Sequence, residues 1–339
     1  MDSLTQIILG GAVGEAVLGK KVGNKAVLWG AIGGTIPDLD TIPGQFLDTV
    51  DKLDIHRGFS HSIVFAILIA PILGWLIHKI YYKKKEASVW DWTQLMFWAV
   101  FTHPLLDIFT TWGTQLFWPL DWRIAIQSIF VIDPIYTVPF LLLLLTVLFL
   151  KRNNPIRTKL NRLGLILSST YLLITVCIKL YINTIFENSL NAQKVEYLQF
   201  DSRPTAFNTI LWTSNVETKD AFLIGYYSLL DETKKVDFYS FEKNEHLLKA
   251  YRNNPDVERL IFLTKGYYTL QKVENGIVMN DLRFGLTEGF NQGKGDFVFS
   301  YHIYETQEGV KIDQNPNSFK GMKGVLSKLA KRVGGTKSF

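Results

Sequence analysis

The stretch "HSIVFAILIAPILGWLIHKIYY", residues 61–82, decides the fold class of this 339-residue chain. It contains no acidic residue and a single lysine, and its length matches the ~20 residues that an α-helix needs to cross a bilayer. A second stretch of this kind, "LGLILSSTYLLITVCIKLYI", covers residues 163–182. Both are expected to be transmembrane helices. Cys177, the only cysteine, lies in the second and is expected to be buried; one cysteine excludes a disulfide framework and a Cys-rich zinc site.

Further helices are expected around these two. Residues 134–150 form a third, shorter candidate span, and residues 92–112 form a fourth that carries His103 and Asp107. The first 36 residues predict two short glycine-rich helices, at about 3–18 and 25–36, that are marginal spans or re-entrant segments. Small residues at such spacing let membrane helices pack closely. Glu15 lies deep in the first helix and is expected to pair with Lys20 or Lys21.

Basic residues gather in three loops, "KKVGNK" (20–25), "KKKE" (83–86) and "KRNNPIRTKLNR" (151–162). The positive-inside rule places these loops in the cytoplasm. Six passes through the cytoplasmic (inner) membrane are consistent with this placement. Residues 37–60, residues 113–133 and everything after residue 183 are then extracytoplasmic.

The last third of the chain has a different pattern. Short runs such as "VEYLQF", "AFLIGYYSL", "RLIFLTKGYYTLQKV" and "DFVFSYHIYE" are separated by turn residues, which is typical of β-strands. The sequence therefore predicts a polytopic α-helical membrane domain of about 4–6 helices (1–182) and a small extracytoplasmic α+β or mostly β domain (183–318). Residues 319–339 form a basic amphipathic tail that is expected either on a membrane surface or in solvent.

Carboxylates and imidazoles from distant parts of the sequence fall near the same predicted face. They occur in "PDLD", "HRGFSHS" and "HPLLD", and the candidate metal ligands are Asp38, Asp40, His56, His61, His103 and Asp107. His103 and Asp107 are four residues apart, which places them on one face of a helix. Such a ligand set without cysteine suits zinc, with manganese as the alternative, and one to three ions. A plain His–Asp hydrogen bond and a solvated helix end are the structural alternatives.

These motifs, in the order "MDSLTQIILGGAVGEAVLG", "GTIPDLD", "HRGFSHS", "HPLLDIFTTWGTQLFWP" and "VIDP", resemble the YdjM family over roughly residues 1–180. Its members are described as membrane-bound metal-dependent hydrolases of bacteria and archaea. The order of acids and histidines is also distantly similar to zinc-dependent phospholipase C, which implies that Asp133 belongs to the metal shell. Many YdjM members have a histidine where this chain has Gln6, so one possible ligand is missing.

The function expected from these residues is metal-assisted hydrolysis of an ester or phosphoester in a membrane lipid or lipid-linked substrate at the outer face. Asp40 or Asp133 would orient the attacking water or act as general base, and Arg57 would hold a phosphate. The expected partner is membrane lipid rather than nucleic acid. An ion-coupled transporter and a non-catalytic protein stabilised by metal are the alternatives.

Overall fold

A computed structural model gives the architecture and describes residues 1–315 and 322–337. The chain forms two compact units. The first comprises Met1–Phe46, Ile55–Cys177 and Ala206–Asn208, and the second comprises Leu47–Asp54, Ile178–Thr205 and the described residues from Thr209 onward. The sequence predicts a domain limit at residue 182. The two compact units divide after Cys177, within one long helix. The short segment 47–54 also belongs to the second unit.

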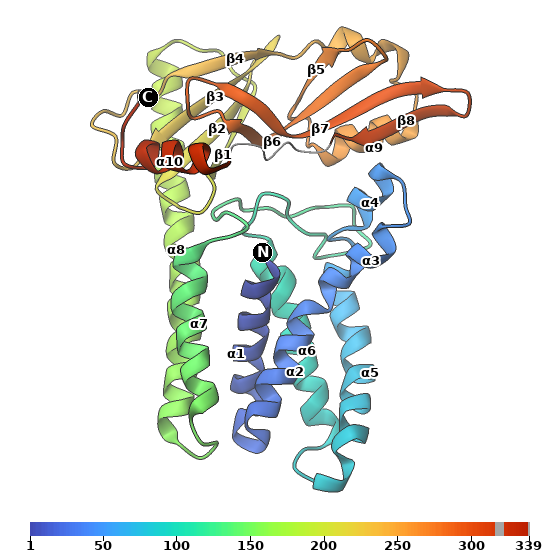
Figure 1. Cartoon of the computed structure of the whole chain (residues 1–339), viewed down its shortest axis with the longest axis vertical. Helices are drawn as coiled ribbons and strands as arrows, with labels where there is room; N and C mark the ends of the chain where they lie inside the picture. The colour runs from blue at the N-terminus through green and yellow to red at the C-terminus, as the bar shows by residue number, and fades with distance from the viewer. Residues whose placement is uncertain (316–321, 338–339) are drawn as a thin grey trace. The chain divides into compact units, whose positions relative to one another are not determined.

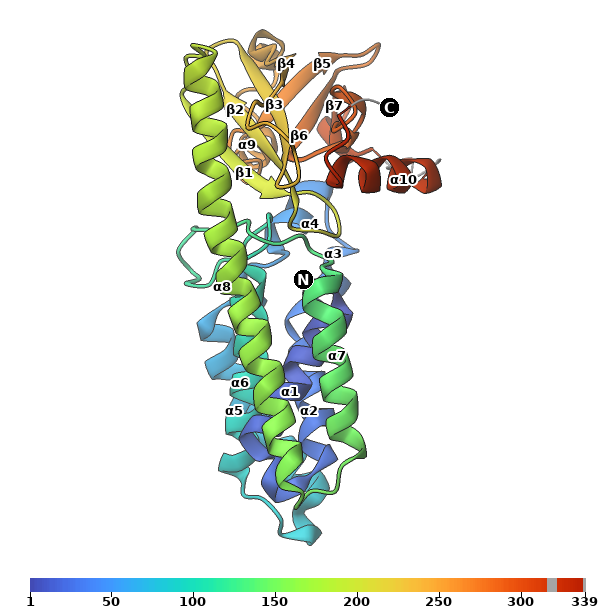
Figure 2. The same ribbon diagram turned by 90° about the vertical axis from the view of Figure 1, so that its left-hand side faces the viewer.

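The first unit is built from helices. Their bounds are α1 (Ser3–Val22), α2 (Asn24–Thr35), α3 (Thr41–Gly44), α5 (Ile63–Tyr81), α6 (Val89–Asp107), α7 (Pro134–Phe149) and the first part of α8 (Pro155–Ala192), with the 3-10 turns η1 (Pro37–Asp40), η2 (Phe59–His61) and η3 (Tyr82–Lys84). The long helices run side by side (Figure 1, Figure 2), with α1 against α2, α6 and α7, and α5 against α6. Ser62 caps the N-terminus of α5.

Among the residues that the structure describes, two helices are long and apolar enough to cross a membrane, Ile63–Lys84 and Pro155–Ala192, and α7 is a shorter apolar helix. The helical nature of the first part of the chain is thus confirmed. The prediction that Cys177 is buried was wrong, because its side chain is exposed on α8. In a helix that is apolar on every side, hydrophobicity does not distinguish the packed face from the outer face.

Glycines let α1 and α2 touch through their backbones. A Cβ atom added at Gly10 would lie 2.3 Å from the carbonyl oxygen of Gly30, and one added at Gly34 would lie 2.5 Å from that of Gln6. Gly14 meets the carbonyl oxygen of Ala26 in the same way, at 2.2 Å. No larger residue fits at these positions without moving a helix. We call this contact the glycine seam.

Glu15 is buried and pairs with Arg157 of α8, with separations of 2.7 Å to Nε and 2.6 Å to Nη2. The expected pairing with Lys20 or Lys21 was therefore wrong. The lysines lie near the exposed end of α1, whereas Arg157, which is 1% exposed, reaches into the bundle. Its Nη1 also donates to Asn24 and to the carbonyls of Val147 and Leu150. This network ties four helices together at the end of α1 that lies away from Gln6.

The second unit is β-rich, as predicted. Its strands are β1 (Gln199–Pro204), β2 (Leu211–Glu217), β3 (Ala221–Ser228), β4 (Phe238–Glu242), β5 (Tyr268–Lys272), β6 (Ile277–Glu288), β7 (Lys294–Thr306) and β8 (Gly309–Gln314). They form two antiparallel sheets, β1-β2-β3-β4 and β5-β6-β7-β8. The helices of this unit are α4 (Thr49–Ile55), the end of α8, the 3-10 turn η4 (Glu245–Ala250), α9 (Pro255–Leu263) and α10 (Met322–Val333). The last residue of α4, Ile55, belongs to the first unit.

One element of this unit differs from the sequence expectation. The apolar run "RLIFL" is the end of helix α9 rather than a strand, because Asn254 caps the helix and Pro255 occupies its first turn. The predicted tail forms α10, which packs on its own unit. Arg332 pairs with Asp231, and the hydroxyl of Ser228 donates to the carbonyl of Val333. Residues 319–321 and 338–339 of the predicted tail lie outside the described residues.

Candidate metal centre

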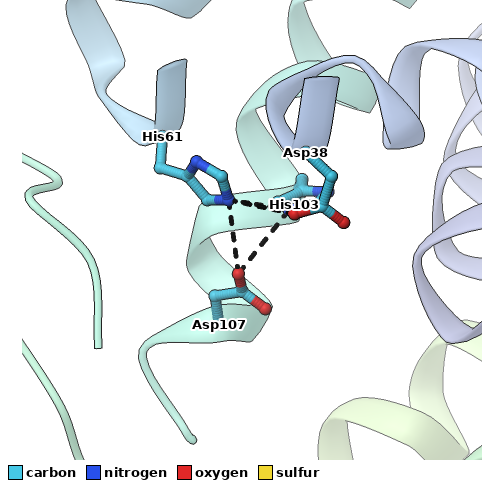
Figure 3. A group of neighbouring side chains, drawn as sticks. All are labelled: Asp38, His61, His103 and Asp107. Carbon is cyan, nitrogen blue, oxygen red and sulfur yellow. Dashed lines mark hydrogen bonds and ion pairs between the residues drawn. The ribbon is translucent and has the colours of Figure 1, made fainter. Parts of the chain in front are cut away.

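Four side chains from three separate segments meet at one end of the first unit (Figure 3). Asp38 comes from η1, His61 from η2, and His103 and Asp107 from the last turns of α6. His103 and Asp107 face the same point because they are one helical turn apart. One ligand atom from each residue lies within 4.8 Å of the other three.

The separations between these atoms match those of a small coordination site. His61 Nε2 and His103 Nε2 are 3.1 Å apart, and each lies 3.4 Å from Asp38 Oδ1. Asp107 Oδ2 lies 3.5 Å from His61 Nε2 and 3.6 Å from His103 Nε2. A tetrahedral zinc ion with bonds of about 2.0–2.1 Å requires ligand separations of about 3.3–3.4 Å.

The hydrogen bonds behind the two imidazoles fix which nitrogen faces the site. His103 Nδ1 lies 2.6 Å from the carbonyl oxygen of Gly34, an acceptor, so Nδ1 carries the proton and Nε2 keeps its lone pair. His61 Nδ1 lies 3.3 Å from Asp40 Oδ2 and 2.9 Å from Ser60 Oγ. Carboxylate and carbonyl partners of this kind are typical of metal-binding histidines.

Asp107 is completely buried, and its two oxygens have different surroundings. Oδ1 accepts hydrogen bonds from the Met1 amino group and, at 3.0 Å, from Gln6 Nε2. Among the described residues no donor forms a hydrogen bond to Oδ2, although Arg57 Nε lies 3.1 Å away as an ion pair. A buried carboxylate oxygen without a hydrogen bond, facing the Nε2 atoms of two imidazoles, is expected where a cation is to be bound. The residues present therefore fit a divalent metal ion.

The remaining predicted site residues lie around this cluster or apart from it. Asp40 is behind His61 and holds the loop: it accepts hydrogen bonds from Ser60 Oγ at 2.7 Å and from the amide of Arg57 at 3.0 Å, and it lies 3.0 Å from His56 Nδ1. His56 therefore contacts Asp40 and does not belong to the group of four ligand residues. Asp133 lies elsewhere, because it caps α7 and accepts a hydrogen bond from Tyr171.

Arg57 has an unusual backbone conformation, with φ of 61°. A non-glycine residue in this left-handed region is strained by about 1–3 kcal/mol. Its amide bonds Asp40, its carbonyl accepts from the amide of Gln115, and its side chain reaches Asp107 and Thr110. These contacts hold the strained residue in place between the candidate ligands and their supports.

The carboxylates around His61 change the pKa of its imidazole. Burial disfavours charge on the imidazole, but the carboxylate of Asp107, followed by those of Asp38 and Asp40, raises the pKa of His61 to about 9. The pKa of Asp38 is well below its usual range despite burial, because both imidazoles of the cluster contact it. Burial lowers the pKa of His56, although its contact with Asp40 opposes this.

Sequence reasoning missed two contributors. Gln6 was treated only as a lost ligand, yet it is fully buried and bonds both Asp107 and the carbonyl of His103. The carbonyl of Gly34 orients His103. The amide near the start of a mostly apolar helix was a signal for Gln6, whereas a backbone carbonyl leaves no signal in the sequence.

Comparison with known proteins gives a consistent assignment. The protein YfhP of Bacillus subtilis (strain 168), described as uncharacterized, is 30% identical over 142 residues, which is 40% of this chain and 42% of YfhP. The inner membrane protein YbcI of Escherichia coli (strain K12) is 31% identical over 106 residues, which is 31% of this chain and 59% of YbcI. Each match thus spans less than two thirds of the relative's length. No solved structure matches. The family model described as YdjM inner membrane protein matches residues 1–184, and the chain with its Asp–His cluster accordingly belongs to the YdjM family.

Proposed function

We propose that this protein is a membrane-bound metal-dependent hydrolase, with Asp38, His61, His103 and Asp107 as its metal ligands. The observation that carries the proposal is the set of five ligand separations between 3.1 and 3.6 Å, which join the Nε2 atoms of two imidazoles and one oxygen of each carboxylate. Two imidazoles and two carboxylates suit zinc, with manganese as the alternative. In the proposal Asp40 supports the ligand His61 and pairs with His56, and Asp133 is left to its role as a helix cap.

The proposed substrate is an ester or phosphoester of a membrane lipid or lipid-linked molecule. Three observations support a site at the membrane boundary. The ligand His61 lies two residues before a candidate span, Asp38 follows the end of α2, and Asp107 is the last residue of α6. The positive-inside rule, applied to the three basic loops, puts this end of the helices on the extracytoplasmic face and gives four to six crossings.

A divalent ion held by these ligands would supply Lewis acidity, polarising the ester oxygen and making water a nucleophile at neutral pH. The chain's own residues have separable roles. Asp40 holds His61 so that Nε2 faces the site, and its bond to His56 forms the carboxylate–imidazole pair that general base catalysis uses. The guanidinium of Arg57 lies beside Asp107 and would stabilise negative charge that develops on the substrate.

The test uses purified full-length protein, with its metal content determined by elemental analysis, incubated with a membrane lipid extract. We expect product release that stops with chelator and returns with zinc or manganese. His56→Gln should retain metal and lose activity, whereas Asp133→Asn should retain both. Full activity of metal-free protein would refute the proposal. Stoichiometric metal without hydrolysis of any lipid class would favour the alternative of a metal-stabilised, non-catalytic protein.

A further inference from the structure

In segment 36–46, which carries the candidate ligand Asp38, acidic side chains point inward and large apolar side chains point outward. This is the reverse of an amphipathic helix in water. Its two acids turn inward: the Asp40 side chain is 8% exposed and the Asp38 side chain 24% exposed, and both contact imidazoles. Its large apolar side chains turn outward, with Leu39, Ile42 and Phe46 exposed by 52, 54 and 86%. These three lie at positions i, i+3 and i+7, so one outer row carries them all.

Such a row is unfavourable in water. Large apolar side chains left in water forgo the favourable free energy that burial would give them. The segment also contains no lysine, arginine or glutamate that would solvate its outer side. The same arrangement is favourable when the outer side faces acyl chains.

Aromatic side chains mark the same end of the unit. Phe59, in the turn that carries His61, is 41% exposed and contacts Trp118 with ring centroids 4.9 Å apart. Trp122 is 60% exposed and stacks on Phe117. The aromatic loop is tied to the site's own loop, since the amide of Ile63 donates to the carbonyl of Leu116. Exposed tryptophans are enriched at the level of lipid headgroups.

The length of the adjoining helix α5 indicates how deep the candidate site lies in the membrane. α5 has 19 residues and is therefore about 28 Å long at 1.5 Å per residue, close to the ~30 Å hydrocarbon thickness. Its first residue, Ile63, is two positions after the ligand His61. The site and the turns around it thus belong at the boundary between acyl chains and headgroups.

We infer that the outer row of segment 36–46 is covered by the acyl chains of the membrane leaflet. The segment would lie along the interface, with its carboxylates toward the metal centre and its apolar row in lipid. A molecule that reaches the centre past this segment would then come from the bilayer rather than from water. This inference concerns the surface and does not depend on hydrolysis, so the proposed activity can fail without affecting it.

The test places a nitroxide spin label on the row in a Cys177→Ser background, which removes the native thiol. Ile42→Cys and Phe46→Cys are compared after reconstitution into phosphatidylcholine–phosphatidylglycerol vesicles. Ile67→Cys serves as the lipid control, since Ile67 is 54% exposed on a candidate span, and Lys219→Cys as the aqueous control. Collision rates with oxygen and with a water-soluble nickel complex are measured by power saturation.

We expect both labels on the row to collide more with oxygen than with nickel, as at Ile67, and Lys219 to show the opposite order. A nickel preference at Ile42 and Phe46 would mean that water covers the row and would overturn the inference. Low collision rates with both reagents would mean that protein covers it, either the C-terminal unit or a second copy, and would overturn it equally. Retained metal binding of each labelled protein shows that the site has folded.

Discussion

Asp40 offers the sharpest test of how the site is built, because replacing it separates a supporting residue from a ligand. Its Oδ2 accepts hydrogen bonds from the Ser60 hydroxyl and the Arg57 amide and faces His61 Nδ1, while Oδ1 faces His56 Nδ1. In Asp40→Asn the amide oxygen can keep the Oδ2 contacts but the charge is lost. In Asp40→Ala all four partners lose their acceptor.

Partners of metal-binding histidines typically contribute 10–100-fold to metal affinity. We therefore expect zinc affinity to fall about tenfold in Asp40→Asn and about a hundredfold in Asp40→Ala, or about 1.4 and 2.7 kcal/mol. His61→Ala, which removes a ligand, should lose more than either. Affinity is measured by isothermal titration calorimetry on metal-depleted protein with a competing chelator.

The control is Asp133→Asn, because Asp133 is a buried carboxylate that caps α7 and does not contact the cluster. It should bind zinc as the unaltered protein does. The reasoning is refuted if Asp40→Ala binds zinc with unchanged affinity. It is also refuted if Asp40→Ala loses zinc as completely as His61→Ala, because Asp40 would then be a ligand.

Three other predictions concern the ligands, the proton and the bundle. Asp107→Ala should abolish metal binding and the rise in melting temperature that metal gives, whereas His78→Ala should keep both; a melting curve insensitive to chelator, on protein shown to have carried metal, would contradict this. Zinc affinity should keep rising about tenfold per pH unit up to about pH 9, because zinc displaces the proton from His61, whose pKa is raised to about 9; a plateau from about pH 7 would be inconsistent with it. Glu15→Ala should destabilise the protein by about 3–5 kcal/mol, measured by chemical denaturation, because it leaves Arg157 buried and unpaired.

The sequence allowed the fold to be predicted where a pattern was long or repeated. Two apolar stretches matched the length of a membrane span, and alternating runs predicted the strands of the second unit. The prediction failed where the same local sequence is compatible with two structures. The apolar run in α9 was read as a strand although Asn254 and Pro255 marked the start of a helix. Glu15 had basic neighbours in sequence, but its partner, Arg157, is 142 residues away.

For the candidate site, the sequence predicted the residue types but not their arrangement. Asp38 and Asp40 are only two residues apart and looked equivalent. Both lie on a 3-10 turn, where a step of two residues rotates a side chain by about 240°. One carboxylate therefore faces the cluster and the other faces the back of His61. Nothing in the local sequence encodes this direction, because it depends on where the η2 turn lies.

The glycine seam has a consequence for the chemistry of the centre. The carbonyl that accepts the hydrogen bond from His103 Nδ1 belongs to Gly34, which is itself in the seam between α1 and α2. A side-chain acceptor could rotate to follow a shifted imidazole, but a backbone carbonyl moves only with its helix. The spacing between two helices and the orientation of one imidazole are therefore coupled. A methyl group added at Gly10 would press on Gly30 and Gly34, and it would thereby displace the carbonyl that orients the ligand His103.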